Sequence, residues 1–240
     1  AAAAETPTAA DRWIRSRIVD AIDQSTAAFE QYEYNKAVRA TEALFWKDWC
    51  DNYLEIVKDR FRNPDNWQAG EVEAARRTIF EGTWAILRMF APVLPFVTEE
   101  LYETGLKPRL GDDAPASIHV APWPVSDAGN DTFGGERDAA GEALGELLVD
   151  LVAAVRQLKT LAQTGLGTPV ETVYVRCADD VRADVEQVQR DFQAAARAAD
   201  VVFGAPDSGE NEDADAAGAP THQVGARSLY IGIITAPRET

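Results

Sequence analysis

The sequence predicts a mainly α-helical protein: an antiparallel helical bundle followed by a small α/β unit. Apolar residues recur every three or four positions through the first hundred residues, which is the period of an amphipathic helix. A stretch rich in Gly, Asp and Asn, 126–135, then reads as a linker. Beyond it, segments with alternating apolar residues accompany further helical ones. We therefore expect two domains, 1–125 and 136–240.

Three long helices are expected in the first domain, at 11–31, 36–60 and 71–91. Asp11 and Asn35 are suitable N-caps for the first two helices, and prolines follow the third. Because the connecting loops are short, the helices should pack as an antiparallel bundle. The apolar stripes predict one core containing eight large residues: Ile18, Ile22, Phe29, Phe45, Trp49, Ile79, Ile86 and Phe90.

A short helix at 96–104 and an extended strap at 118–124 complete the first domain. Pro122 and Pro124 argue against a helix in the strap, and we expect Trp123 to lie across the bundle. The second domain begins with a helix at 136–163. A strand at 172–177, a helix at 179–199 and strands at 200–203 and 228–235 follow, as indicated by alternating or helical spacing of their apolar residues. An acidic loop is expected at 207–219.

Composition excludes several classes of protein. With 240 residues and 46% hydrophobic content the chain can build a core, so disorder of the whole chain is excluded. No apolar run is long enough to span a bilayer and no basic signal-peptide region opens the chain, so we expect a cytoplasmic protein with no membrane partner. Two distant cysteines and two histidines form no disulfide framework and no zinc motif, so no metal site is expected.

The charge balance is strongly acidic. Forty acids against 23 bases give a net charge of −17, and only five of the bases are lysines. Such a surface suits a protein that works at molar salt, where screening removes self-repulsion. The alternative is an ordinary acidic protein with a solvated face. In both cases, any nucleic-acid binding must depend on local basic patches.

Catalytic signatures are not recognisable in the sequence. It contains no phosphate-binding P-loop, no dinucleotide-binding glycine pattern and no nucleophile elbow. Paired acids such as Glu99 and Glu100 lie at expected helix starts, where they complement the helix dipole. The residue patterns alone therefore indicate a binding module with no catalytic residue.

Four segments carry a resemblance to a known family. They are 11–17 (Asp-Arg-Trp-Ile-Arg-Ser-Arg), 45–55 (Phe-Trp-Lys-Asp-Trp-Cys-Asp-Asn-Tyr-Leu-Glu), 94–102 (Leu-Pro-Phe-Val-Thr-Glu-Glu-Leu-Tyr) and 118–124 (Ile-His-Val-Ala-Pro-Trp-Pro). Their order and spacing resemble the C-terminal region of class I valyl-tRNA synthetases, and 136–240 resembles the α/β extension of archaeal-type members. An isoleucyl- or leucyl-type synthetase is the alternative within this superfamily.

The resemblance implies an anticodon-binding bundle that contacts tRNA(Val). Adenylation, transfer and editing would belong to upstream domains of the same enzyme, which use ATP with Mg²⁺. Neither His-x-Gly-His nor Lys-Met-Ser-Lys-Ser, the two ATP-handling signatures of class I synthetases, occurs in this chain. We therefore expect a part of valine–tRNA ligase that binds no cofactor and cannot aminoacylate alone. A helical interaction module that never meets RNA is the competing hypothesis.

Basic residues are the candidate tRNA contacts, because phosphates require grouped cations. One group should lie at one end of the bundle and a weaker one on the helix at 136–163; the candidates are Lys58, Arg60, Arg62, Arg76 and Arg77, and then Arg156 and Lys159. Lys58 and Arg60 could instead complement the dipole at a helix C-terminus, and Arg76 and Arg77 could simply pair with Glu73 and Glu81. Trp67, in a turn-rich loop, is a candidate for stacking on an unpaired base.

Overall fold

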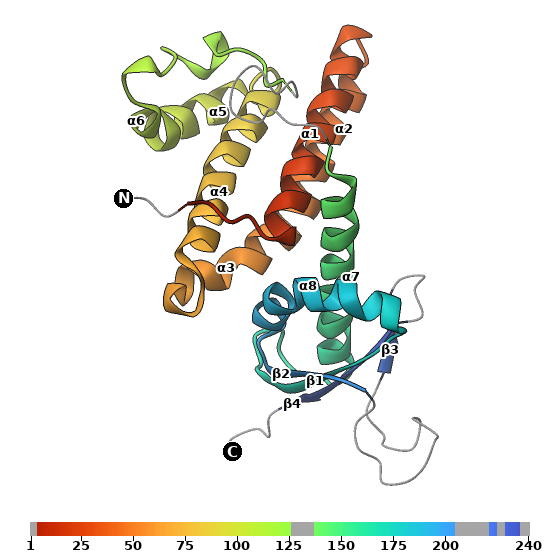
Figure 1. Cartoon of the computed structure of the whole chain (residues 1–240). Coiled ribbons are helices and arrows are strands. Elements are labelled where there is room, and N and C mark those ends of the chain that lie inside the picture. The colour runs from red at the N-terminus through yellow and green to blue at the C-terminus, as the bar shows by residue number, and fades with distance from the viewer. Residues whose placement is uncertain (1–3, 126–136, 205–220, 225–228, 236–240) are drawn as a thin grey trace, which may run out of the picture. The chain divides into compact units, whose positions relative to one another are not determined.

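The computed structural model (Figure 1) describes residues 4–125, 137–204, 221–224 and 229–235. It is mainly helical with a small sheet towards the C-terminus, as the sequence predicts. The chain forms two compact units, one of residues 1–55 and 63–142 and the other of residues 56–62 and 143–240. The linker expected at 126–135 and the acidic loop expected at 207–219 lie outside the described residues.

Three long helical segments make up most of the first unit, although the end of the second segment, 56–62, belongs to the second unit. α1 (Ala9–Glu30) is followed by a continuous helical run of α2 (Tyr34–Ala43), the π-helical segment η1 (Leu44–Tyr53) and α3 (Leu54–Arg62). After a 3₁₀ turn (Pro64–Asn66), α4 (Ala69–Phe90) runs beside α1. The predicted helix boundaries are correct to within two residues.

The N-caps differ from those predicted. Asp11 is the third residue of α1, where its carboxylate accepts the backbone N–H of Thr8 at 2.9 Å, so Thr8 is the cap. The other carboxylate oxygen of Asp11 accepts the hydroxyl proton of Tyr53 at 2.8 Å. Asn35 lies inside α2, whose cap residue is Glu33. Both predicted caps are therefore wrong. Asp11 is a short polar residue that serves as the third residue of a capping box instead of as the cap, and α2 begins one residue before Asn35.

The predicted core lies between α1, η1 and α4. Four of its eight residues are buried and the other four are half-buried, and none is exposed: Ile18, Ile22, Trp49 and Ile86, then Phe29, Phe45, Ile79 and Phe90. Gly82 of α4 faces the Trp49 ring so closely that a Cβ there would lie 2.5 Å from two ring carbons. The glycine therefore sets the distance between α4 and η1.

A smaller subdomain follows α4. It contains α5 (Pro95–Leu101), the π-helical turn η3 (Tyr102–Leu106), α6 (Lys107–Leu110) and a 3₁₀ turn (Gly111–Asp113). Tyr102 stacks on Trp84 of α4 with ring centroids 5.3 Å apart, within a cluster of buried residues that also contains Leu87, Ala91, Leu106 and Ile118.

The strap is extended over only part of its length. Ile118–Val120 forms a 3₁₀ turn, which the Ser117 hydroxyl caps by accepting the His119 N–H at 3.1 Å. The prediction was wrong there because the two prolines constrain only the residues next to them. The indole N–H of Trp123 donates to Thr26 Oγ1 at 2.8 Å, and its ring packs edge-on against Phe29, so the strap crosses α1 as expected.

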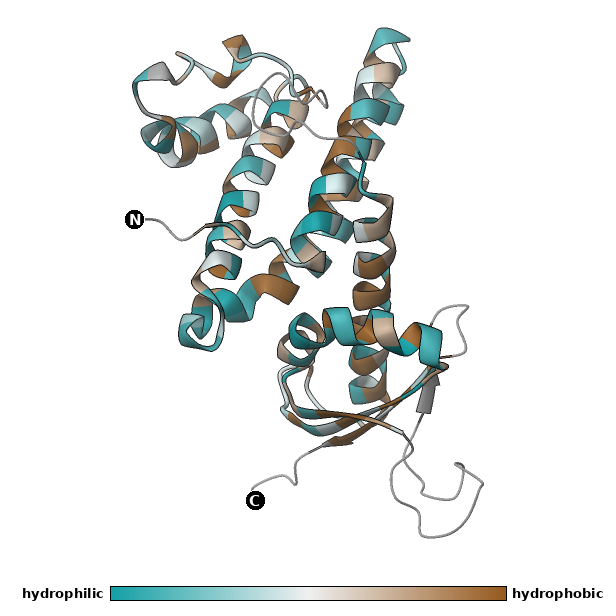
Figure 2. Ribbon diagram, viewed as in Figure 1, coloured by the Kyte–Doolittle hydropathy of each residue, from teal (hydrophilic) through white to brown (hydrophobic). Residues whose placement is uncertain are grey.

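The second unit is a sheet with helices. Its elements are α7 (Ala139–Leu161, from residue 143), β1 (Val170–Arg176), α8 (Asp179–Ala196), β2 (Ala198–Phe203), β3 (Thr221–Gln223) and β4 (Tyr230–Thr235). The strand order is β2-β1-β4-β3, with β1 parallel to β2 and the other pairs antiparallel. Figure 2 shows hydrophobic residues along α7 and in β1 and β4, and Val173, Val175, Ile231 and Ile233 are buried.

Two details of this unit were not predicted. Arg197 adopts a left-handed conformation with φ of 56° and ends α8, so the predicted helix at 179–199 is too long. β3 is a three-residue edge strand without an alternating apolar pattern, so no periodicity signals it. No helix in the described part of the chain could cross a membrane.

Candidate nucleic-acid interface

Two neighbouring arginines of α4 lie on the surface of the first unit. The helix begins with a capping box between Gln68 and Glu71, which places Arg76 and Arg77 two turns into the helix. Arg76 is 64% exposed, and its guanidinium donates to Glu73 at 3.0 Å. Such an exposed pair contributes at most ~1 kcal/mol, so a phosphate oxygen can replace the carboxylate.

Arg77 is held more firmly than Arg76. Its guanidinium pairs with Glu81 at 2.7 Å and with Glu5 at 2.8 Å. The hydrogen bonds that the guanidinium donates to Glu5 and then to Glu81 raise the pKa of Arg77 above its ordinary value. Glu81 is buried and also accepts from Arg15 at 2.8 Å. The pairing with Glu73 and Glu81 that the sequence allowed as an alternative is therefore present, although both guanidiniums remain half exposed or more.

The cations of α3 do not form one surface. Arg60 is fully buried within the second unit, where its guanidinium donates to Asp191 of α8 at 2.7 Å. Lys58 is half-buried and Arg62 is exposed. Residues two positions apart on a helix point in nearly opposite directions, so Arg60 faces inward when Lys58 and Arg62 face outward. The i, i+2, i+4 spacing could have signalled this division.

The two residues of the second predicted group, Arg156 and Lys159, also differ in burial. Lys159 is buried in the second unit, and its ammonium donates to the carbonyls of Leu166 at 3.1 Å and Ala196 at 2.9 Å. Burial, with smaller contributions from Arg197 and Arg156, lowers the pKa of Lys159 to about 8. Arg156 is half-buried. Lys159 therefore serves the fold, and Arg156 remains as the accessible member of the pair.

Trp67 is not available for base stacking. Its backbone N–H donates to the Pro64 carbonyl at 3.0 Å, which closes the turn after α3, and its side chain is buried. The polar neighbours of Trp67 suggested exposure, but a turn can fold an aromatic side chain back onto the helix that follows. Exposed aromatic and apolar side chains occur instead at places that the sequence did not single out, above all at Phe96 of α5.

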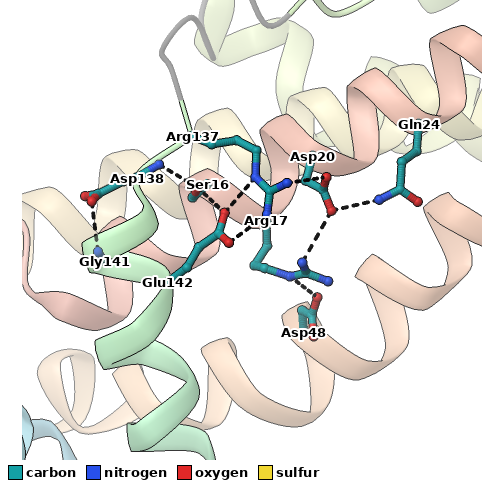
Figure 3. A network of polar contacts seen from close by, with 9 residues as sticks. All are labelled: Ser16, Arg17, Asp20, Gln24, Asp48, Arg137, Asp138, Gly141 and Glu142. Carbon is teal, nitrogen blue, oxygen red and sulfur yellow. Dashed lines mark hydrogen bonds and ion pairs between the residues drawn. The ribbon is translucent and has the colours of Figure 1, made fainter.

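Several other arginines of the first unit are committed to internal ion pairs (Figure 3). Arg17 pairs with Asp48 at 3.0 Å and with Asp20 at 3.3 Å, and Arg137 pairs with Glu142 at 2.7 Å and with Asp20 at 3.1 Å. The Arg137 guanidinium, with a smaller contribution from the Ser16 hydroxyl, lowers the pKa of Glu142. These pairs join α1 to η1 and to the start of α7, so phosphate contact at Arg17 or Arg137 would disrupt the packing of the unit.

Comparison with known proteins supplies the context for this surface. A family model described as the anticodon-binding domain of tRNA ligase matches residues 11–175, more than half of the chain. The valine–tRNA ligase of Methanopyrus kandleri is 36% identical over 198 residues, which is 81% of this chain and 20% of the relative.

Two further relatives are similar to the chain at comparable levels. The valine–tRNA ligase of Salinispora tropica is 32% identical over 196 residues (77% of this chain, 21% of the relative). That of Haloarcula marismortui is 35% identical over 152 residues (63% of this chain, 14% of the relative). The chain thus spans about a fifth or less of the length of these curated relatives.

Proposed function

Because the chain belongs to the family of anticodon-binding domains of tRNA ligases, we propose that it is the part of a valine–tRNA ligase that binds the anticodon arm of tRNA(Val). The identity of 36% to a valine–tRNA ligase carries this proposal. The Salinispora and Haloarcula relatives are also valine–tRNA ligases, which favours the valyl member over an isoleucyl or leucyl one.

In this proposal the chain binds tRNA and the rest of the enzyme performs the chemistry. The two ATP-handling signatures of class I synthetases are absent from the chain. We therefore assign the binding of ATP, Mg²⁺ and valine to the catalytic part of the longer polypeptide. The 240-residue chain alone is expected to bind tRNA without charging it.

In the first unit the proposed contact surface consists of Arg76 and Arg77, and Lys58, Arg62 and Arg156 are separate candidates in the second unit. Arg76 leads this group, because it is the more exposed arginine of α4 and its acid partner, Glu73, is itself partly exposed. Arg60 and Lys159 are left out because both are buried.

A filter-binding titration with tRNA tests the function directly. We expect the chain to bind a tRNA(Val) transcript more tightly than other tRNAs, with an affinity that falls as salt rises because bound counterions are released. Failure to bind any tRNA, at millimolar protein and low salt, would instead support the competing hypothesis of a helical interaction module.

Arginine substitutions test the surface. In the double variant Arg76→Ala, Arg77→Ala, tRNA affinity should fall and the salt slope should decrease by about one phosphate contact per arginine. Lys36→Ala is a matched control, since Lys36 is exposed and pairs with Glu33 on the surface, and it should leave both quantities nearly unchanged. Unaltered affinity together with a lower free energy of unfolding would assign both arginines to the fold alone.

We further propose that the protein is adapted to high salt. Forty acids against 23 bases, with few lysines, support this. Screening of the excess negative charge would then stabilise the folded state and would also limit its repulsion from RNA.

A further inference from the structure

α5 presents an exposed apolar surface to solvent. Phe96 is 90% exposed, the highest value among the large hydrophobic residues that the structure describes, and four neighbours are between 42% and 50% exposed: Val93, Leu94, Val97 and Leu101. We call these five residues the α5 surface. From position 91 to 97 the chain contains no polar side chain. Consecutive exposed apolar residues of this kind indicate a surface that another molecule covers.

The orientation of α5 is fixed by its opposite side. The Glu99 carboxylate accepts the Ser117 hydroxyl at 2.8 Å and the Ile118 N–H at 3.0 Å. Thr98 is buried and donates to the Leu94 carbonyl at 2.8 Å. Just beyond the helix, Tyr102 is held against Trp84 in the core. α5 therefore cannot rotate to bury Phe96 without breaking these contacts.

The charges near the α5 surface exclude RNA and lipid as its partners. Between positions 91 and 106 the only charged residues are Glu99, Glu100 and Glu103, and the next cation along the chain, Lys107, is already paired with Glu103. These acids would repel phosphates, and a membrane-binding helix carries Lys and Arg beside its apolar face. An apolar protein surface is the partner that remains. Glu100, exposed between Phe96 and Val97 around the helix, favours a partner with a basic residue at its rim.

The relatives point to the source of that surface. They are about five times as long as the segment that this chain matches. We infer that the α5 surface docks against an apolar surface of another domain of the same ligase polypeptide, with a Lys or Arg opposite Glu100. This inference rests on the proposed function, because it requires the longer polypeptide.

Thiol labelling at Val97 tests the docking without tRNA. In a Cys50→Ala, Cys177→Ala background, Val97→Cys should react rapidly in the 240-residue chain and at least about tenfold more slowly in the whole ligase polypeptide, where reaction requires local opening. Ala27→Cys, also exposed in the first unit but outside the α5 surface, should react equally fast in both. Equal reactivity of Val97→Cys in the two proteins, or equal protection of both positions, would overturn the inference.

Phe96→Asp provides a second measurement. Since the side chain is almost fully exposed, this change should leave the melting temperature of the 240-residue chain within about 2 °C of the wild type. In the whole ligase, it should restore labelling of Val97→Cys towards the rate in the chain alone. If the chain by itself forms a dimer that Phe96→Asp abolishes, the occupant is a second copy and the inference is wrong.

The outcomes separate docking from tRNA binding. Protection of Val97→Cys in a ligase whose isolated chain binds no tRNA would support the docking and contradict the proposed function. Binding of tRNA(Val) by the chain, with Val97→Cys fully reactive in the whole ligase, would do the reverse.

Discussion

Arg60 and Asp191 form an ion pair that water hardly reaches, since their side chains are 0% and 4% exposed. Taking both charges out of water is unfavourable, and their attraction offsets this only when both are present. Asp191→Ala leaves a buried guanidinium without its carboxylate, and we expect the free energy of unfolding to fall by about 3–5 kcal/mol. Urea unfolding followed by circular dichroism measures this.

Two further variants complete the test of this pair. The double variant Arg60→Met, Asp191→Ala should recover most of the lost stability, because no charge is then buried. Gln187→Ala, at an exposed position of the same helix, should change the free energy of unfolding by less than about 0.5 kcal/mol. If Asp191→Ala behaves like Gln187→Ala, the pair is unimportant for the fold.

Lys159 predicts a particular dependence of stability on pH. Its pKa in the folded state is about 8, below the ordinary 10.5, because burial disfavours the ammonium. Between these values the unfolded chain binds more protons at this site than the folded chain. The free energy of unfolding of the wild type should therefore rise by roughly 3 kcal/mol between pH 8 and 10.5, relative to Lys159→Met. A difference between the two proteins that stays constant over this range would contradict the assignment.

The cationic residues show where sequence reasoning is limited. Arg76 and Arg77 are exposed as expected, and their acid partners could be read from three- and four-residue spacings. The two-residue spacing separates Arg60 from Lys58 and Arg62 but does not tell which side of the helix is buried. The burial of Arg60 and Lys159 could not be predicted, because their partners on α8 and at its C-terminal end are distant in sequence. The local sequence around a long basic side chain on an apolar stripe is the same whether its charged end extends to solvent or donates to a buried acceptor.

Gly82 determines how closely two helical elements pack. In Gly82→Ala the new methyl group would lie 2.5 Å from the Trp49 ring and 3.1 Å from Ile18, both in the core. We expect overpacking to lower the free energy of unfolding by about 1–3 kcal/mol, despite the better helix propensity of alanine. Gly105→Ala is the control: nothing lies within 4 Å of a Cβ at that helical position, so stability should stay equal or rise slightly. Thermal melting of both variants measures these changes in stability.

The sequence was sufficient to predict where most helices and strands lie, but not which helices are of the π or 3₁₀ type. The long helices and three of the four strands in the described residues follow from periods of 3.6 and 2, whereas α6 and the 3₁₀ turns were not predicted. The π-helical segment η1 does not, because Phe45, Trp49 and Tyr53 recur at four-residue steps and therefore fit an ordinary amphipathic helix. Asn52 donates to the Lys47 carbonyl at 2.8 Å, a contact across five residues that only the structure reveals. The α5 surface was missed because the prediction of a helix at 96–104 did not include which of its residues are exposed, and the structure shows Phe96 to be 90% exposed.

Charge acts at the scale of the whole molecule. The chain carries 17 more acids than bases, and many of its arginines already neutralise an acid within one unit, as Arg17 and Arg137 do. The remaining acids repel one another at low ionic strength and favour the expanded unfolded chain. In molar salt the Debye length falls to about 3 Å, which removes most of this repulsion.

The melting temperature should therefore rise markedly between about 0.1 M and molar KCl, even though exposed ion pairs weaken over the same range. The rise exceeds the loss because acids outnumber bases by 17, while the Arg60–Asp191 pair is shielded from salt by burial. Repeating the series near the isoelectric point separates this effect from general salting-out. There the net charge vanishes, so the gain should shrink if repulsion is the cause, and it should persist if KCl merely strengthens apolar burial. A melting temperature that is flat or falls with KCl at neutral pH would show that the acidic surface is not a salt adaptation.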